Sequence, residues 1–413
     1  MAKERSRKGA PRRGSKLRKE PARKPPGFET RAVHAGEEPE DQFRAVIPPI
    51  YHTSTYCLEE VGKSHGYDYS RTGNPTRTML ERKLASLECA KYGLAFASGM
   101  AAVNAVLALL DCGDQVLCEE NVYGGTHRLL SNIFPKFKIG LSWVDATDLE
   151  KVRKGFRENT KLLWIETPTN PLLKILDIEA LARLAHEHHS LLVVDNTFAS
   201  PFLQRPVERG CDIVVHSTTK YIGGHSDFIG GAVVTNNDQV YLDLAYYQNA
   251  AGAVPSPSDC YLAARSLKTL ALRMRQHCFN AKRIAEFLNG DTRIRKVYYP
   301  GLPGHSGHEL AKSQMSDFGG MISFELDGDI ETTKAFVTGL KYFALASSLG
   351  AVESLVAHPV TMTHTSLSLA ERERIGIRDN LVRISVGVED VTDLIEDLDR
   401  ALTKVLGPSR SRR

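Results

Sequence analysis

The sequence predicts a two-domain α/β protein, in which a large, mostly parallel sheet is followed by a smaller C-terminal α/β domain. Short apolar and β-branched runs alternate with helix-like segments along most of the chain, which is typical of a parallel sheet with crossover helices. After about residue 265 this alternation gives way to a long amphipathic segment and a few short strands. A chain of 413 residues is also too long for one ordinary core, so two or three domains are expected.

Each element of this prediction rests on the spacing of apolar residues. Strands of the large sheet are expected at the buried-looking runs 115–118, 162–165, 191–194, 213–215 and 232–234. Helical spacing predicts helices at 79–91, 101–110 and 178–190. In the small domain we expect a long helix at 265–288, strands near 321–326 and 381–386, and a closing helix at 390–406.

The first two segments of the chain are not expected to contribute to a core. Residues 1–27 are predicted to be a disordered basic tail, because they are rich in proline and charge. Residues 28–72 are rich in turn formers and read either as an ordinary loop or as an arm that reaches beyond its own domain. Residues 73–265 are then assigned to the large domain, and 266–413, with a short basic end, to the small domain.

The charge of the chain is concentrated in this tail. Eleven Lys and Arg residues face only Glu4 and Glu20 there, a charge of +9, and since the whole chain carries +4, the remainder carries −5. We favour a solubilising tail. Attraction to a membrane, to nucleic acid or to another polyanion is the alternative, and nucleic acid is disfavoured because no aromatic residue interleaves the charges. An organelle transit peptide is compatible with the composition.

Cysteine and histidine usage bear on the compartment and on metals. Seven cysteines without a Cys-x-x-Cys pair predict reduced thiols and a cytoplasmic protein. No apolar run approaches the roughly 20 residues that cross a bilayer, so no membrane insertion is expected. His186, His188 and His189 close a predicted helix, where cations are favourable, and no matching ligand set lies nearby. No metal site is therefore predicted.

Lys220 is the first candidate for chemistry. It follows the strand-like run 213–215 and three hydroxyl residues, and the glycine pair Gly223-Gly224 turns the chain just after it. The carboxyl ends of parallel strands are where ligands bind in open α/β sheets. A partly desolvated lysine at that edge can act as an amine nucleophile on a carbonyl group. The alternative is an ordinary surface lysine.

Other residues complete a set that suits one cofactor. Asp195 ends the strand-like run 191–194, Ser98 and Gly99 precede an apolar helix, and Tyr123 begins a glycine-rich loop. Arg383 lies in the middle of a predicted strand, where it either faces solvent or binds a carboxylate. Pyridoxal 5′-phosphate needs a lysine for its aldehyde, a carboxylate for its ring nitrogen, free N–H groups for its phosphate and an aromatic face.

With these residues in view, the chain resembles the pyridoxal-phosphate-dependent transsulfuration enzymes of cysteine and methionine metabolism, the family that contains cystathionine γ-lyase and cystathionine γ-synthase. The likeness runs from about residue 28 to 406. It is carried by Tyr-Ser-Arg-Thr-Gly-Asn-Pro-Thr at 69–76, Ala-Ser-Gly-Met-Ala-Ala at 97–102, Tyr-Gly-Gly-Thr at 123–126, Glu-Thr-Pro-Thr-Asn-Pro at 166–171, Val-Asp-Asn-Thr-Phe at 194–198, Ser-Thr-Thr-Lys-Tyr at 217–221 and Arg-Ile-Ser-Val-Gly at 383–387.

The resemblance implies a fold and a role for each matching residue. The fold is that of aspartate aminotransferase, pyridoxal-phosphate fold type I. Lys220, which forms the Schiff base with the cofactor, and Tyr123, which stacks on its ring, are the implied catalytic residues. The implied cofactor-binding residues are Tyr69, Arg71, Gly99, Met100, Tyr123, Asp195, Thr197, Ser217, Thr219 and Lys220. The implied substrate-binding residues are Asn170, Ser347, Ser348 and Arg383, with Arg383 on the α-carboxylate.

Tyr69 and Arg71 are implied to reach the phosphate from a neighbouring subunit. The arm would then contact that subunit, and the protein would be an obligate dimer, usually paired into a tetramer. The implied partner at the site is a small amino-acid substrate.

The implied reaction is γ-elimination of L-cystathionine to cysteine, 2-oxobutanoate and ammonia, and the run 248–257 looks most like lyase sequences. Lyase and synthase share almost the whole site, so cystathionine γ-synthase, which joins O-succinyl- or O-acetylhomoserine to cysteine, is the main alternative. A homoserine-ester sulfhydrylase is a further one. From a different class, the chain would be a non-catalytic scaffold whose basic tail binds a polyanion.

Two positions bear on the choice of substrate. Ser347 stands where the cystathionine enzymes usually carry a glutamate that meets the distal amino group of cystathionine. The loss of one charge-assisted contact costs on the order of 1.5–3 kcal/mol, enough to shift substrate preference. Methionine γ-lyase also lacks this glutamate, but it typically has cysteine where this chain has Gly125, which argues against that activity.

Overall fold

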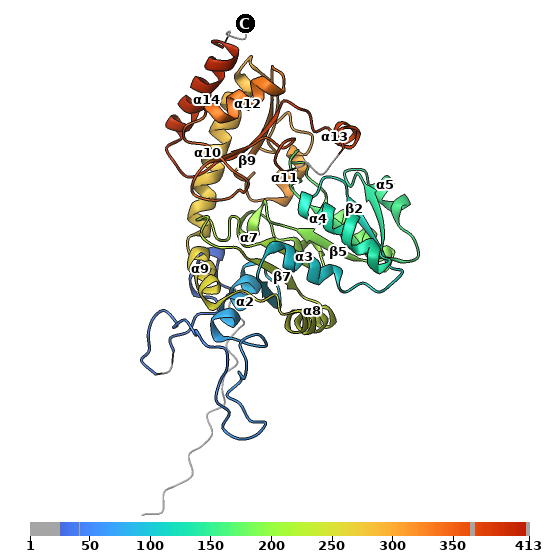
Figure 1. The fold of residues 1–413 in the computed structure, drawn as a ribbon, viewed down its shortest axis with the longest axis vertical. Coiled ribbons are helices and arrows are strands. Elements are labelled where there is room, and N and C mark those ends of the chain that lie inside the picture. The colour runs from blue at the N-terminus through green and yellow to red at the C-terminus, as the bar shows by residue number, and fades with distance from the viewer. Residues whose placement is uncertain (1–24, 41, 364–367, 410–413) are drawn as a thin grey trace, which may run out of the picture.

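The computed structural model describes residues 25–40, 42–363 and 368–409. A large domain and a smaller C-terminal domain are stacked along the long axis of the molecule, and the segment after residue 42 projects from the opposite end (Figure 1). Most of the basic tail, residues 1–24, and the basic end at 410–413 lie outside the described residues. The large and the small domain each contain a sheet of their own.

The large domain is built on a seven-stranded sheet with the order β1-β7-β6-β5-β4-β2-β3. Its strands are β1 (Tyr92–Phe96), β2 (Gln115–Glu119), β3 (Gly140–Val144), β4 (Thr160–Glu166), β5 (Leu191–Asp195), β6 (Ile213–Ser217) and β7 (Gly231–Thr235). Only β7 runs antiparallel to its neighbours, β1 and β6. The predicted mostly parallel sheet is confirmed, although β1 and β3 had no strand prediction.

Helices cover both faces of this sheet, because successive strand residues point to opposite sides. Val193 packs in one hydrophobic core and Val194 in the other. The surrounding helices are α2 (Pro75–Leu87), α3 (Gly99–Leu107), α4 (Gly124–Arg128), α5 (Leu149–Gly155), α6 (Ile178–Glu187), α7 (Ser200–Leu203), α8 (Asp238–Ala251) and α9 (Pro257–Leu267). Short π or 3₁₀ turns lie at η1 (Leu129–Ile133), η2 (Phe134–Phe137) and η3 (Pro206–Arg209).

The small domain has a five-stranded sheet with the order β10-β11-β12-β9-β8. Its strands are β8 (Ile294–Tyr298), β9 (Met321–Leu326), β10 (Ala344–Leu345), β11 (Leu355–Ala357) and β12 (Leu381–Ser385). Its helices are α10 (Leu270–Gly290), α11 (His308–Gln314), α12 (Ile330–Gly339), α13 (Leu369–Ile375) and α14 (Val391–Leu406). β12 is hydrogen-bonded to β11 along one edge and to β9 along the other, so it is a central strand of this sheet.

The single helix predicted at 265–288 is wrong, because α9 ends at Leu267 and α10 begins at Leu270. Thr269 lies in the break and donates a hydrogen bond from its hydroxyl to the Ser266 carbonyl. Thr269 also accepts a hydrogen bond from Arg273 Nε, 3.3 Å away. A threonine that bonds to nearby backbone in this way competes with helix continuation.

The expectation that nothing in residues 28–72 contributes to a core is also wrong at its beginning. Residues Phe28–His34 form the helix α1, and Ala32 is buried in the core of the large domain. Lys83 of α2 is fully buried and donates to the carbonyls of Ala32 and Val33. Beyond α1 the segment stays outside the core, since Val46 and Val61 are 81% and 104% exposed.

Three smaller features concern the sequence predictions. Within the described residues no helix is long and apolar enough to cross a membrane. All seven cysteines carry free thiols. His186 of α6 (Ile178–Glu187) hydrogen-bonds to Asp212, and the ring of His188, just after this helix, stacks on Phe156.

Candidate active site

A cavity of about 360 Å³ lies at the carboxyl ends of β4, β5 and β6, where segments of the small domain close over the sheet. All the predicted site residues line it except Tyr69 and Arg71. Residues that were not predicted also line the cavity. Among them are the charged Arg128 and Glu166, the polar Thr363 and the apolar Met362. The site therefore forms where the parallel sheet predicts ligand binding.

Lys220 lies in this cavity just after β6, and the surface-lysine alternative is wrong. Its ammonium Nζ is 2.8 Å from the hydroxyl of Ser348, which comes from the small domain. Burial, with a smaller contribution from the Arg383 charge, lowers the pKa of Lys220 to about 8. A substantial share of the side chain is then neutral near physiological pH, as an amine nucleophile or base requires.

Asp195, the last residue of β5, is a buried carboxylate in the same cavity. It accepts a hydrogen bond from the Thr197 amide, 3.0 Å away. Desolvation raises its pKa, and no cationic side chain among the described residues forms an ion pair with it. An uncompensated buried carboxylate is costly. It fits the protonated ring nitrogen of pyridoxal phosphate, so the residues present suit the predicted cofactor.

The start of α3, where the sequence predicts an anion site, lies at the wall of the cavity. Ser98 caps the helix by accepting a hydrogen bond from the Ala101 amide, and Gly99 is its first residue. A Cβ on Gly99 would lie 2.9 Å from the Cβ of Ser217, so glycine is required for this close approach. Met100 and the hydroxyls of Ser217 and Thr219 line the cavity beside it. Free N–H groups and hydroxyls at a helix start suit a phosphate.

Tyr123 lies at the beginning of α4 with its side chain 44% exposed. Its amide donates a 2.8 Å hydrogen bond to Oε2 of Glu166. A Cβ on Gly125 would lie only 2.4 Å from Cε1 of Tyr123, so Gly125 lets this ring pack against the helix. Glu166 was not predicted as a site residue, although it ends a strand just as Asp195 does.

Arg383 of β12 is buried in the cavity, so its solvent-facing alternative is wrong. It donates to Oδ1 of Asn170 at 2.9 Å and to the carbonyl of Ser348 at 3.1 Å. Both acceptors are neutral, and burial lowers the pKa of Arg383 to about 10. Among the described residues it has no carboxylate partner within ion-pair distance. A buried guanidinium with this fork geometry is suited to bind the carboxylate of a ligand.

Ser347 and Arg128 contribute to the remaining wall. Ser347 precedes Ser348 in the segment after β10, and Arg128 is the last residue of α4. Arg128 was missed by the sequence prediction, although it lies only five residues after Tyr123 in the same motif region. The only carboxylates among the described residues of the wall are Glu166 and Asp195.

Tyr69 and Arg71 lie outside the cavity of their own chain. Arg71 donates to the backbone carbonyl and to Oδ1 of Asn249, and its guanidinium is 5.5 Å from the centre of the Tyr69 ring. Tyr69 is 45% exposed on the projecting segment. The structure of one chain therefore leaves these two residues available to contact another molecule.

Known proteins share both the sequence and the fold of this chain. A family model described as Cys/Met metabolism PLP-dependent enzyme matches residues 29–403. A cystathionine β-lyase from Lactococcus lactis subsp. cremoris (strain MG1363) is 50% identical over 377 residues, which cover 91% of this chain and 99% of that protein. A cystathionine γ-lyase from Dictyostelium discoideum is 48% identical over 376 residues, which cover 91% of this chain and 97% of that protein.

A solved structure agrees with these relatives. Cystathionine γ-synthase from Xanthomonas oryzae pv. oryzae, in complex with aminoacrylate and cysteine, has a TM-score of 0.90 and 44% identity, covering 92% of this chain and 99% of that one. The predicted fold type I is confirmed, and the non-catalytic scaffold is set aside because the relatives are enzymes. The chain belongs to the pyridoxal-phosphate-dependent enzymes of cysteine and methionine metabolism, and pyridoxal phosphate is its cofactor.

Proposed function

We propose that this protein is a carbon–sulfur lyase that converts L-cystathionine and water to cysteine, 2-oxobutanoate and ammonia by γ-elimination. The observation that carries the proposal is the pairing of Arg383 and Lys220 in one cavity. Among the described residues no carboxylate pairs with the buried cation of Arg383, and Lys220 is an amine with a pKa lowered to about 8. An amino acid brings the missing carboxylate and presents its acidic Cα proton near the amine.

The residues of the cavity divide into those for the cofactor and those for the substrate. Lys220 would bind the aldehyde of the cofactor, Asp195 would pair with its ring nitrogen, and Tyr123 would stack on the ring. Its phosphate would be bound by Gly99, Met100, Ser217 and Thr219, supported by Thr197, whose hydroxyl accepts the Ser217 amide at 2.9 Å. When bound, pyridoxal phosphate supplies the electron sink for carbanion chemistry.

The substrate would be held and deprotonated by side chains that already contact one another. Arg383, positioned by Asn170 and the Ser348 carbonyl, would bind the α-carboxylate. Lys220 would remove the proton from Cα and then one from Cβ, after which the sulfur attached at Cγ leaves. The Ser348 hydroxyl, 2.8 Å from Lys220 Nζ, would orient the amine between these positions.

A second candidate is γ-replacement, the cystathionine γ-synthase reaction, and the wall of the cavity favours it. Ser347 provides no negative charge for a distal amino group, whereas Arg128 provides a positive charge suited to the succinyl group of O-succinylhomoserine. Relatives named β-lyase, γ-lyase and γ-synthase all match at about 44–50% identity, so identity alone supports none of them over the others.

Product analysis of the purified, cofactor-loaded protein tests the proposal. L-cystathionine is incubated with the enzyme, and keto acids and thiols are identified by mass spectrometry. We expect 2-oxobutanoate and cysteine in equal amounts. Pyruvate with homocysteine would make the enzyme a β-lyase. A parallel reaction with O-succinyl- or O-acetylhomoserine and cysteine reports the synthase if cystathionine accumulates, and sulfide in place of cysteine reports a sulfhydrylase.

We also infer that the active form is a homo-oligomer, with a dimer of dimers expected. The exposed apolar side chains of the segment after residue 42 and the outward position of Tyr69 and Arg71 support it. In that assembly Tyr69 and Arg71 of each chain would bind the phosphate in a neighbouring copy.

Residues 28–72 would then include the arm, with 73–265 and 266–413 as the cofactor domain and the small domain. The free thiols support a reducing compartment such as the cytoplasm.

A further inference from the structure

Glu166 is a second buried carboxylate in the cofactor cavity. It is the last residue of β4 and pairs in register with Asp195, the last residue of β5. Glu166 is 3% exposed and lines the same cavity as Asp195. Neighbouring parallel strands thus bring two carboxylates side by side at the edge where the cofactor binds.

The surroundings of Glu166 compensate a negative charge only in part. Among the described residues no cation forms an ion pair with it, and the Arg383 guanidinium donates instead to Asn170 and Ser348. Burial and the charge of Asp195 raise its pKa well above the usual range, because they outweigh the opposing effects of the Tyr123 amide and the Arg383 charge. Two adjacent buried carboxylates with one expected cation, the cofactor ring nitrogen, favour one ionised and one neutral acid.

The contacts of Glu166 show what a neutral acid would do here. Its Oε2 accepts the Tyr123 amide at 2.8 Å, which fixes the start of α4 and the ring of Tyr123. No hydrogen bond from the described residues engages Oε1. With Oε2 occupied as an acceptor, the proton of a neutral acid lies on Oε1, the oxygen that no donor from the described residues engages.

We propose that Glu166 is a positioning residue of the active site and acts as a neutral acid, which anchors Tyr123 through one oxygen and presents an O–H donor to the cavity through the other. Asp195 is then the only carboxylate that balances the cofactor ring nitrogen. The inference concerns pyridoxal phosphate, the cofactor of this family, and does not depend on which substrate the enzyme converts.

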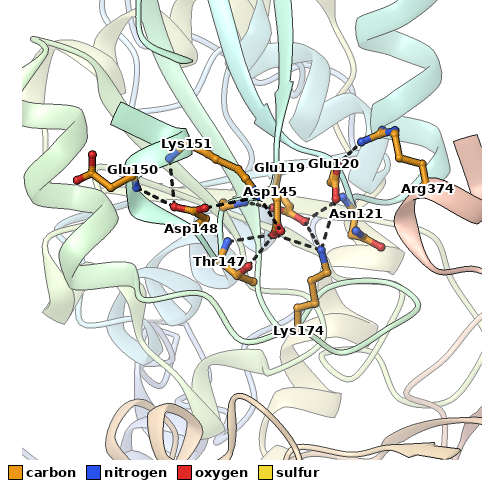
Figure 2. Close-up of polar contacts among 11 residues, drawn as sticks. Glu119, Glu120, Asn121, Asp145, Thr147, Asp148, Glu150, Lys151, Lys174 and Arg374 are labelled. Atoms are coloured by element: carbon orange, nitrogen blue, oxygen red, sulfur yellow. Dashed lines mark hydrogen bonds and ion pairs between the residues drawn. The ribbon is translucent and has the colours of Figure 1, made fainter. Parts of the chain in front are cut away.

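Glu119 offers a matched comparison within the same sheet. It is a fully buried glutamate at the carboxyl end of β2, and burial raises its pKa to about 7. Its oxygens accept the Asn121 and Ala146 amides, and Lys174 Nζ lies 3.9 Å away (Figure 2). Lys174 also faces Glu120 and Asp145 there, and Glu119 does not line the cavity. Neutralising Glu119 therefore controls for the loss of a buried glutamate outside the site.

The test uses the full-length protein with and without pyridoxal phosphate, and no substrate. Glu166→Gln keeps an acceptor for Tyr123 and a donor for the cavity, whereas Glu166→Met fills similar space without either. Cofactor affinity and the pH titration of the visible cofactor band are measured for both variants and for Glu119→Gln. Amide hydrogen exchange at Tyr123 is measured in the wild-type protein, so the anchor is tested even if Glu166→Met does not fold.

We expect Glu166→Gln to bind the cofactor within about twofold of the wild-type affinity and to leave the titration midpoint unchanged, as Glu119→Gln does. Glu166→Met is expected to bind about tenfold more weakly, with a protected Tyr123 amide in the wild type. A midpoint that falls by about one pH unit in Glu166→Gln would show an ionised glutamate and overturn the proposal. Wild-type affinity in Glu166→Met, or rapid exchange at the Tyr123 amide, would remove the positioning role.

Discussion

At the scale of single residues, the site depends on buried charges that have no oppositely charged partner in the part of the chain that the structure describes. Asp195 lacks an ion-pair cation within the described chain, and Arg383 donates only to neutral oxygens. Each buried charge is energetically unfavourable without a charged partner, and a ligand that supplies the opposite charge compensates this cost. The cofactor ring nitrogen suits Asp195, and the substrate carboxylate suits Arg383. Stability is thereby given up locally in exchange for ligand binding.

The lowered pKa of Lys220 gives a prediction for cofactor capture by the apoenzyme. The neutral amine attacks the cofactor aldehyde, so the rate should rise with pH and level off above about 8 rather than about 10.5. Arg383→Met removes a charge that lowers this pKa, and the rise should move to higher pH. Stopped-flow measurement of the visible band checks both. A rate that still rises steeply between pH 9 and 11 in the wild type would contradict the buried, depressed lysine.

Strand ends and a helix start pointed to Lys220, Asp195 and Gly99, whereas most other predicted site residues were implied only by the family resemblance. Glu166 and Arg128 were missed as site residues for different reasons. The role of Glu166 depends on its register beside Asp195, which spacing along one strand does not specify. Arg128 enters the cavity only because α4 begins at Gly124 and turns it inward. The burial of Arg383 likewise requires β12 to pack between two other strands.

At the scale of elements, α1 shows how a distant contact overrides local composition. The segment around it looks like a loop, yet Lys83, some fifty residues along the chain, holds the carbonyls of Ala32 and Val33. Lys83 also pairs with Glu37 at 2.6 Å, which in turn pairs with Lys268 at 2.5 Å. The expected strands of the sheet were found because their apolar runs are a local signal, whereas the burial of α1 is a tertiary one.

This network predicts the cost of removing Lys83. Lys83→Met should lower the free energy of unfolding by about 3 kcal/mol, because buried carbonyls lose their donor and Glu37 loses one of its two cations. Urea unfolding measures the change, and amide exchange in α1 should accelerate. Lys91→Met removes a lysine that pairs with Asp238 at 2.6 Å on the surface, and it should produce no comparable change. Equal effects of the two substitutions would contradict the buried network.

At the scale of the whole molecule, we propose that residues of a second copy complete the site of each chain. The two domains close the cavity around Lys220, but Tyr69 and Arg71 do not line it. They belong to the segment between α1 and α2, which projects from the large domain (Figure 1). Apolar side chains on that segment, such as Val46 and Val61, are left exposed by their own chain. A partner copy that covers them and receives Arg71 explains both features, although sequence spacing alone does not indicate where the arm would dock.

Mixed oligomers test this exchange of residues. Arg71→Ala and Lys220→Ala are each expected to reduce activity strongly, through the phosphate site and the amine respectively. In a hybrid dimer, one site combines Lys220 of the Arg71→Ala chain with Arg71 of the Lys220→Ala chain and is intact. Random reassembly of equal amounts should therefore restore about a quarter of wild-type activity. No recovery, with hybrid formation verified by native mass spectrometry, would place Arg71 in its own chain's site.

We propose that the cavity between the sheet edge and the small domain binds pyridoxal phosphate through Lys220. Borohydride reduction of the loaded protein fixes the carbon–nitrogen bond between lysine and cofactor, and peptide mass spectrometry then identifies the modified residue. We expect the reduced cofactor on Lys220 in the wild-type protein and no modified peptide in Lys220→Ala. Modification of a different lysine, with Lys220 unmodified, would contradict it.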